Sequence, residues 1–177
     1  MIPRELIASA AVPGGGELRL VRRGEEYSIM LGANELMNSR LSGSEEALAA
    51  LACAKLAAVD RPRILIGGLG MGFTLRAALA DLPPGAKVTV CELVPEVVKW
   101  ARGPMAELFA GSLEDSRTSL VEEDVIPAGE AAKGYVAITT QASGTAYPVI
   151  QEVVVSRSEN GTWLIDSSTD TGEPCAG

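Results

Sequence analysis

The sequence predicts an α/β protein: a partial Rossmann-like parallel sheet, with an N-terminal antiparallel meander before it and a β-rich C-terminal tail after it. An apolar run at 63–66 breaks into closely spaced glycines and a helical segment, and a second strand-like run follows at 87–91. Before residue 42, short runs alternate apolar and polar side chains, as half-buried strands do. After residue 126 the chain is rich in Thr, Ser, Val and Gly, without an alternation of strands and helices.

We therefore expect three parts, with the β meander at 1–41, the Rossmann-like nucleotide-binding half at 42–125 and a β-hairpin-rich tail at 126–177. The predicted strands are 17–22, 27–31, 35–37, 63–66, 87–91, 120–125, 135–140, 147–155 and 162–166. The predicted helices are 42–59, 73–82 and 95–101, with a further helical turn at 104–110. Asn160-Gly161 is typical of a tight hairpin turn in the tail.

Composition excludes several classes of function. A net charge of −8 argues against nucleic-acid binding and against binding to an anionic membrane surface. No apolar run approaches the roughly 18 residues of a membrane span, and the start lacks a signal-peptide pattern, so we expect a cytoplasmic protein. Histidine is absent, which excludes Ser-His-Asp and Cys-His catalysis and most zinc chemistry. The three cysteines are widely spaced, so we predict no metal site and interpret Cys53 and Cys91 as core residues.

The glycine-rich segment after the first parallel strand carries the main functional signal. Gly68, Gly70 and Gly72 lie between the strand and a helix, and Glu92 ends the next strand. Glycines let a backbone approach a nucleotide closely, and an acid at the second strand end can bind two ribose hydroxyls. The same glycines could instead serve only close packing of the helix on the strand. The GxGxG spacing departs from the GxGxxG fingerprint of NAD sites, which argues against NAD as the ligand.

Residues 65–75, Leu-Ile-Gly-Gly-Leu-Gly-Met-Gly-Phe-Thr-Leu, resemble the nucleotide loop of the spermidine-synthase-like group of the S-adenosylmethionine-dependent methyltransferase superfamily. Glu92, within Cys-Glu-Leu, stands where the family's ribose-binding acid stands, and Asp124 matches the acid that faces the adenine amino group. Residues 36–40 and 44–48 resemble the segment ahead of that core. The resemblance covers residues 1–125, and no segment after Asp124 matches the family's fourth strand.

The resemblance implies a transferase that binds S-adenosylmethionine or its decarboxylated form and transfers a methyl or an aminopropyl group. It implies that Gly68, Gly70, Gly72, Glu92 and Asp124 hold the cofactor, while the small-molecule acceptor and the catalytic residues stay unassigned. The alternative is a non-catalytic nucleotide-binding or assembly module derived from the same fold. Three parallel strands alone would leave an open sheet edge, which the tail or a second subunit must cover, so we also predict a homodimer.

Three further positions, two acidic and one aromatic, have simpler interpretations. Glu45 and Glu46 lie in the first turn of the predicted helix that follows Ser42, where acids stabilise the helix dipole. We therefore interpret both as helix N-terminal charges rather than as site residues. Trp100 lies three residues after Val97 on the apolar face of its helix, so we expect it in the core.

Overall fold

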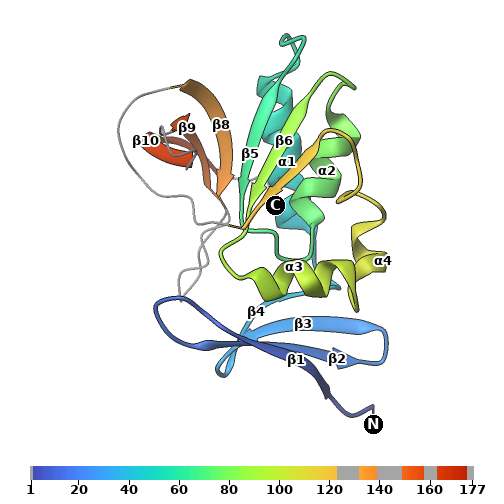
Figure 1. Ribbon diagram of the computed structural model, residues 1–177. Helices are drawn as coiled ribbons and strands as arrows, with labels where there is room; N and C mark the ends of the chain where they lie inside the picture. The colour runs from blue at the N-terminus through green and yellow to red at the C-terminus, as the bar shows by residue number, and fades with distance from the viewer. Residues whose placement is uncertain (1, 123–131, 139–148, 158–162, 175–177) are drawn as a thin grey trace.

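The protein contains two β-sheets that meet at one end of the molecule (Figure 1). The structure is a computed structural model, and it describes residues 2–122, 132–138, 149–157 and 163–174. One sheet has four strands in the order β1-β2-β3-β4, and the other has six in the order β10-β9-β8-β5-β6-β7. The predicted class, a partial Rossmann-like α/β fold with an N-terminal meander, is confirmed.

The N-terminal sheet is antiparallel throughout. It consists of β1 (Glu5–Ala11), β2 (Glu17–Arg23), β3 (Glu26–Leu31) and β4 (Asn34–Asn38). The last three match the predicted strands, whereas β1 lies in a segment to which the sequence assigned no element. A bulge between Leu6 and Ala8 shifts the register of β1, and the strand is rich in alanine, which has low β-propensity. Both features hide the alternation that would have predicted it.

The central part follows the predicted order of strands and helices. Its elements are α1 (Gly43–Lys55), β5 (Arg63–Gly67), α2 (Phe73–Asp81), β6 (Lys87–Cys91), α3 (Pro95–Arg102), α4 (Ala106–Phe109) and β7 (Thr118–Val121). β6 pairs in parallel with both β5 and β7. The prediction for the third strand, 120–125, was two residues late at its start and extended beyond the last strand residue, Val121.

The tail extends the parallel sheet. β8 (Ala132–Ile138) pairs in parallel with β5, and β9 (Val149–Arg157) and β10 (Trp163–Pro174) continue the sheet in antiparallel fashion. The parallel strands therefore run in the spatial order third, second, first, fourth, as in one half of a doubly wound fold. The sheet edge at β5, which we expected the tail or a second subunit to cover, is covered by β8. The predicted turn at Asn160-Gly161 lies outside the described residues.

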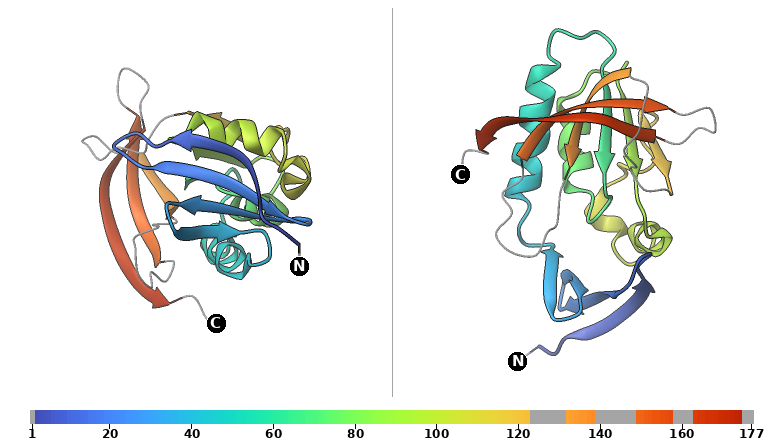
Figure 2. Two further views of the ribbon diagram at one scale, coloured as in Figure 1. Left: turned by 90° about the horizontal axis from the view of Figure 1, so that it is seen from below. Right: turned by 90° about the vertical axis from the view of Figure 1, so that its left-hand side faces the viewer.

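The N-terminal sheet lies across the carboxyl ends of the parallel strands (Figures 1 and 2). Leu20 and Ile29 of this sheet belong to the same buried cluster as Leu69 and Met71, which follow β5. Because the two sheets share one hydrophobic core, burial fixes the N-terminal sheet over the end of the parallel sheet where Rossmann-like folds bind ligands. Trp100 is 4% exposed in this core, as predicted. Within the described residues, no helix is long and apolar enough to cross a membrane.

Candidate functional site

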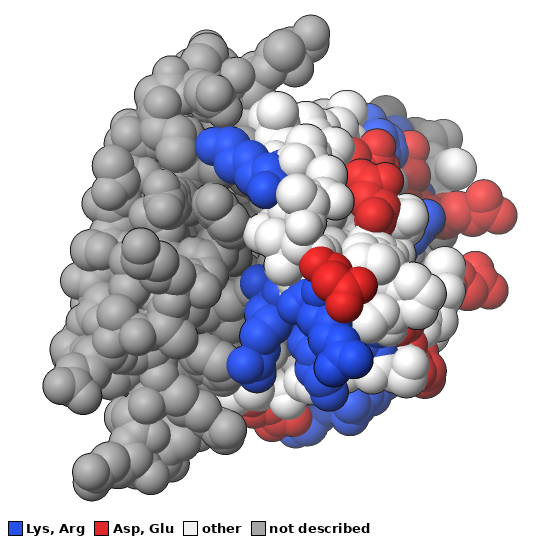
Figure 3. All heavy atoms as spheres, turned by 90° about the horizontal axis from the view of Figure 1, so that it is seen from above, with Lys and Arg blue, Asp and Glu red and all other residues white. Residues whose placement is uncertain are grey.

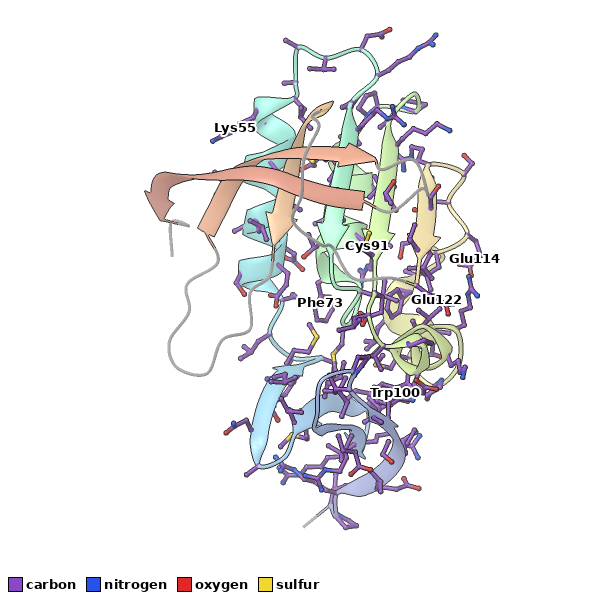
Figure 4. All side chains as sticks on the ribbon, turned by 60° about the vertical axis from the view of Figure 1, so that its left-hand side comes forward. Lys55, Phe73, Cys91, Trp100, Glu114 and Glu122 are labelled. Carbon is purple, nitrogen blue, oxygen red and sulfur yellow. The ribbon has the colours of Figure 1, made fainter. Side chains whose placement is uncertain are left out.

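A cavity of about 200 Å³ lies between the N-terminal sheet and the carboxyl end of the parallel sheet. It is lined by apolar side chains of the meander, by the glycine segment and start of α2, and by two glutamates. These residues are Leu18, Ile29, Leu36, Met37, Glu45, Gly68, Leu69, Gly70, Gly72, Phe73, Thr74, Glu92 and Val97. Figure 4 shows Phe73 and Trp100 in the region where the two sheets meet. All three predicted cofactor glycines and the predicted ribose-binding acid, Glu92, thus line one cavity.

The three glycines lie in different surroundings. Gly68 is exposed, so its backbone is open at the end of β5. Gly70 has φ +51°, and a Cβ there would come within 2.8 Å of the sulfur of Met37, a flexible side chain from β4. Gly72 has φ +77°, and a Cβ there would overlap the ring of Phe109. Close packing therefore explains the need for glycine at position 72, and Met37 covers Gly70. Gly68 alone of the three is exposed, and its amide donates a hydrogen bond to the carbonyl of Cys91 at 2.7 Å.

Glu92 holds the glycine segment in place. Its side chain is 8% exposed, and its two carboxylate oxygens accept separate backbone hydrogen bonds. Oε2 accepts from the amide of Leu69 at 2.8 Å, and Oε1 accepts from the amide of Val94 at 2.9 Å. A carboxylate has about four lone-pair positions, so capacity remains for a hydroxyl of a bound ligand. Glu92 is thus a tether between β6 and the glycine segment as well as a lining residue, a role that the sequence did not indicate.

The start of α2 points polar groups at the same cavity. Gly72 is the N-cap residue, and neither a side-chain cap nor an acid in the first turn satisfies the first amides of this helix. Thr74, in that first turn, is 7% exposed and lines the cavity. Within the described residues its hydroxyl has no hydrogen-bond partner. Since a polar group in a largely buried side chain is stabilised by a hydrogen bond, this hydroxyl is available to a ligand that enters the cavity.

Glu45, which the sequence analysis interpreted as a helix N-terminal charge, also lines the cavity. It lies in the first turn of α1 and is half-buried, whereas its neighbour Glu46 is exposed and accepts a hydrogen bond from the Ser42 hydroxyl at 2.8 Å. The positions of Glu45 and Glu46 in the helix do not predict this difference in exposure, because the exposure depends on how the meander folds over the glycine segment. Thr74 is a lining residue to which the sequence analysis gave no role.

Asp124, the predicted adenine-binding acid, lies outside the described residues. Among the described residues, no group of three His, Cys, Asp or Glu side chains is placed to hold a metal ion. The cysteines at 53 and 91 are buried and form no disulfide. Burial, followed by the charge of Asp81, raises the pKa of the Cys53 thiol to about 11, which keeps it protonated and unreactive at neutral pH.

The sequence and the fold both resemble known proteins of one kind. Over 65 residues the chain is 43% identical to a polyamine aminopropyltransferase of Sulfolobus acidocaldarius. The structure matches a spermidine synthase from Thermotoga maritima, and a spermidine synthase in complex with the transition-state analogue AdoDATO, each with a TM-score of 0.54 and 20% identity over 67% of this chain. The fold of this segment is that of the spermidine synthases. No protein-family model matches the chain.

The matched proteins are considerably longer than the matched part of this chain. The spermidine-synthase-like segment spans 21% of the curated aminopropyltransferase and 40–41% of the solved spermidine synthases. The predicted resemblance to the spermidine-synthase-like group is confirmed for this segment. The fold places the cavity at the carboxyl end of the parallel strands, where the glycine segment, Glu92 and the start of α2 meet.

Proposed function

We propose that the cavity binds an adenosyl sulfonium nucleotide and that the chain belongs to an enzyme that transfers an aminopropyl group from it to an amine. The observation that carries this proposal is the convergence of Gly68, Glu92 and the free Thr74 hydroxyl on one cavity. The similarity to a polyamine aminopropyltransferase and to a spermidine synthase crystallised with AdoDATO supports the choice of ligand and of reaction.

In this proposal each residue has a defined part. Glu92 accepts hydrogen bonds from the ribose hydroxyls while it keeps its bonds to the amides of Leu69 and Val94. The exposed backbone at Gly68 lets the ligand approach, and Thr74 provides a further hydrogen bond from the start of α2. Asp124 is proposed to bind the adenine amino group. When bound, the sulfonium makes the adjacent carbon electrophilic, so the protein contributes mainly by alignment of the two reactants.

The volume of the cavity requires a local adjustment. About 200 Å³ is less than the roughly 300–1,000 Å³ typical of ligand pockets. Met37 lies over Gly70, and methionine is the most adaptable of the apolar side chains, so its movement would enlarge the cavity toward the meander. We therefore expect binding to involve rotation of Met37 rather than displacement of the backbone.

Calorimetric titration of the full chain with S-adenosylmethionine and with its decarboxylated form tests the proposal. We expect saturable binding of at least one of them, followed by transfer to an amine in a turnover assay with a panel of primary amines. No heat and no thermal shift with either ligand would contradict the binding site. Binding without turnover on any amine would favour the alternative, a non-catalytic nucleotide-binding module.

We also propose that the protein forms a homodimer. β8 covers the sheet edge on which we first based this expectation, so a dimer would instead use an exposed edge such as β1, where Leu6 is 58% exposed. Light scattering at micromolar concentration tests this, and a monomeric mass would contradict it.

A further inference from the structure

Basic side chains gather at the amino ends of the parallel strands, at the opposite end of the sheet from the cavity (Figure 3). Arg63 begins β5, Lys87 begins β6, and Arg61 lies in the turn that leads into β5. All three side chains are exposed. The chain as a whole carries a net charge of −8, so this basic cluster (Arg61, Arg63 and Lys87) differs in sign from the protein around it.

Arg63 and Lys87 are direct neighbours across two parallel strands, because the register of β5 and β6 pairs one with the other. Adjacent strands lie about 4.8 Å apart, and paired residues place their side chains on the same face of a sheet. Ile64 and Val88, the next residue of each strand, belong to the hydrophobic core, so alternation directs the two cations to the other face. Like charges at such neighbouring positions repel each other and lower stability.

Arg61 joins the same surface through the turn that precedes β6. The amide of Lys87 donates a hydrogen bond to the carbonyl of Pro62 at 2.9 Å, which holds the segments before the two strands together. A Cβ added at Gly85 would lie 3.5 Å from Cγ of Arg61, so the stem of Arg61 packs against this turn. The three positive charges therefore share one surface, built from two adjacent turns and the strands that follow them.

Within the described residues, no carboxylate pairs with the basic cluster. None of the ion pairs and side-chain hydrogen bonds of this part of the chain includes its three members. Arg117, at the start of the next strand, shows the contrasting case, because its side chain donates hydrogen bonds to Asp115 at 2.7 and 3.0 Å. Asp60 and Asp81 instead line a groove between the ends of α1 and α2. The cluster is thus a group of neighbouring cations without a described counter-charge.

We propose that the basic cluster binds a diphosphate, either free pyrophosphate or the diphosphate of a nucleotide. A guanidinium presents a planar fork of donors that matches two phosphate oxygens, and an ammonium adds a compact charge beside it. A single phosphate group carries at most about two negative charges at pH 7, so a diphosphate matches three cations better. An anion between Arg63 and Lys87 also replaces their repulsion with attraction.

This site is independent of the nucleotide proposed for the cavity. The cavity lies at the carboxyl ends of the same strands, and the ligand proposed for it carries a positive sulfonium. A diphosphate at the amino ends is therefore a second ligand of opposite charge, and its binding stands or fails separately.

Calorimetric titration of the full chain with pyrophosphate and with ADP, at constant ionic strength, tests this inference. We expect saturable binding of both, and Arg63→Gln and Lys87→Gln should each weaken it about fivefold. Arg102→Gln is the matched control, since Arg102 is exposed at the end of α3 and also has no ion pair within the described residues. The control should change neither affinity. Tighter binding of ADP would assign the site to nucleotides, and equal binding would assign it to the diphosphate alone.

The unfolding temperature provides a second measurement. Lys87→Gln removes the repulsion with Arg63, so at low salt and without ligand it should unfold at or above the wild-type temperature, whereas pyrophosphate should stabilise wild type more than this variant. A lower unfolding temperature of Lys87→Gln would overturn the repulsion on which the site rests. An equal loss of affinity in Arg102→Gln would show that net charge alone attracts the anion. That result, the absence of saturable binding, or full affinity in Arg63→Gln combined with Lys87→Gln would each overturn the site.

Discussion

The carboxylate of Glu92 accepts a hydrogen bond from the backbone amide of Leu69 at 2.8 Å, across 23 residues of sequence. This contact joins the end of the second parallel strand to the glycine segment that follows the first. The second carboxylate oxygen accepts a hydrogen bond from the amide of Val94, so the side chain is itself held in place. Glu92 therefore fixes the conformation of the glycine segment without a ligand. An acid at this position thus has two functions, preorganisation of the loop and, in our proposal, binding of ribose.

Replacement of Glu92 tests the first of these functions in the absence of ligand. In Glu92→Gln one of the two carboxylate oxygens becomes an amide NH₂, which cannot accept a hydrogen bond. Either the amide of Leu69 or the amide of Val94 therefore loses its acceptor. We expect the free energy of unfolding to fall by about 2 kcal/mol, because a buried amide loses its charged acceptor. Chemical denaturation measures this loss. The control is Glu107→Gln, at an exposed position, which should leave stability within about 0.5 kcal/mol of wild type. Equal stability of Glu92→Gln and the control would contradict the tether.

Gly72→Ala tests the packing role of the last glycine of the segment. Alanine at φ +77° is strained, and its Cβ would overlap the ring of Phe109, so two penalties combine. Gly32→Ala is the matched control, because Gly32 has φ +58° and an added Cβ there would meet no atom within 4 Å. We expect the control to lose about 1 kcal/mol and Gly72→Ala to lose at least about 1 kcal/mol more. Similar losses in both variants would show that contact with Phe109 is unimportant.

Thr74→Val removes the unpartnered hydroxyl at the start of α2 while it preserves the shape of the side chain. We expect stability without ligand to be unchanged or slightly higher, and nucleotide affinity to fall about fivefold in calorimetry. Thr118→Val is the control, and we expect it to change stability rather than nucleotide affinity. The Thr118 hydroxyl donates to the carbonyl of Ser112 at 2.9 Å, so its loss should lower stability by about 1 kcal/mol and leave affinity unchanged. Full nucleotide affinity in Thr74→Val would remove Thr74 from the site.

The pair of Asp115 and Arg117 predicts a pH dependence of stability below pH 4. Side-chain and then backbone hydrogen bonds from Arg117 hold the pKa of Asp115 at about 2, below its ordinary value of 3.8. Because the folded-state pKa is the lower one, the pair stabilises the fold above about pH 4, and this contribution disappears as the pH falls toward about 2. The unfolding temperature of Asp115→Asn should therefore lie below that of wild type at neutral pH and approach it at low pH. A difference that does not change with pH would contradict the assignment.

The features that sequence reasoning predicted well are local ones. β5, β6, α2 and α3 follow from apolar runs and from proline signals at the helix boundaries, because Pro83 follows the end of α2 and Pro95 begins α3. The glycine segment likewise indicates its own turn. The position of Glu92 at the end of β6 follows in the same way. These features depend on neighbouring residues, so the sequence was sufficient to place them.

The features that it missed depend on contacts between distant segments. The bulge in β1 breaks the alternation near Leu6, and the parallel pairing of β8 with β5 joins residues about 70 positions apart in the register of Ile64 with Tyr135. Glu45 belongs to the cavity only because the meander folds over the glycine segment. No pattern within α1 distinguishes Glu45 from Glu46, and only the tertiary fold does so.

The most direct test of the central claim is a nuclear magnetic resonance titration of the isotope-labelled full chain with decarboxylated S-adenosylmethionine. We predict that the largest changes in backbone amide shift occur at Leu69, Gly70 and Thr74, around the cavity between the two sheets. Shifts confined to distant positions such as Gly32, or no shifts at a saturating concentration of ligand, would contradict the claim that this cavity is the nucleotide site.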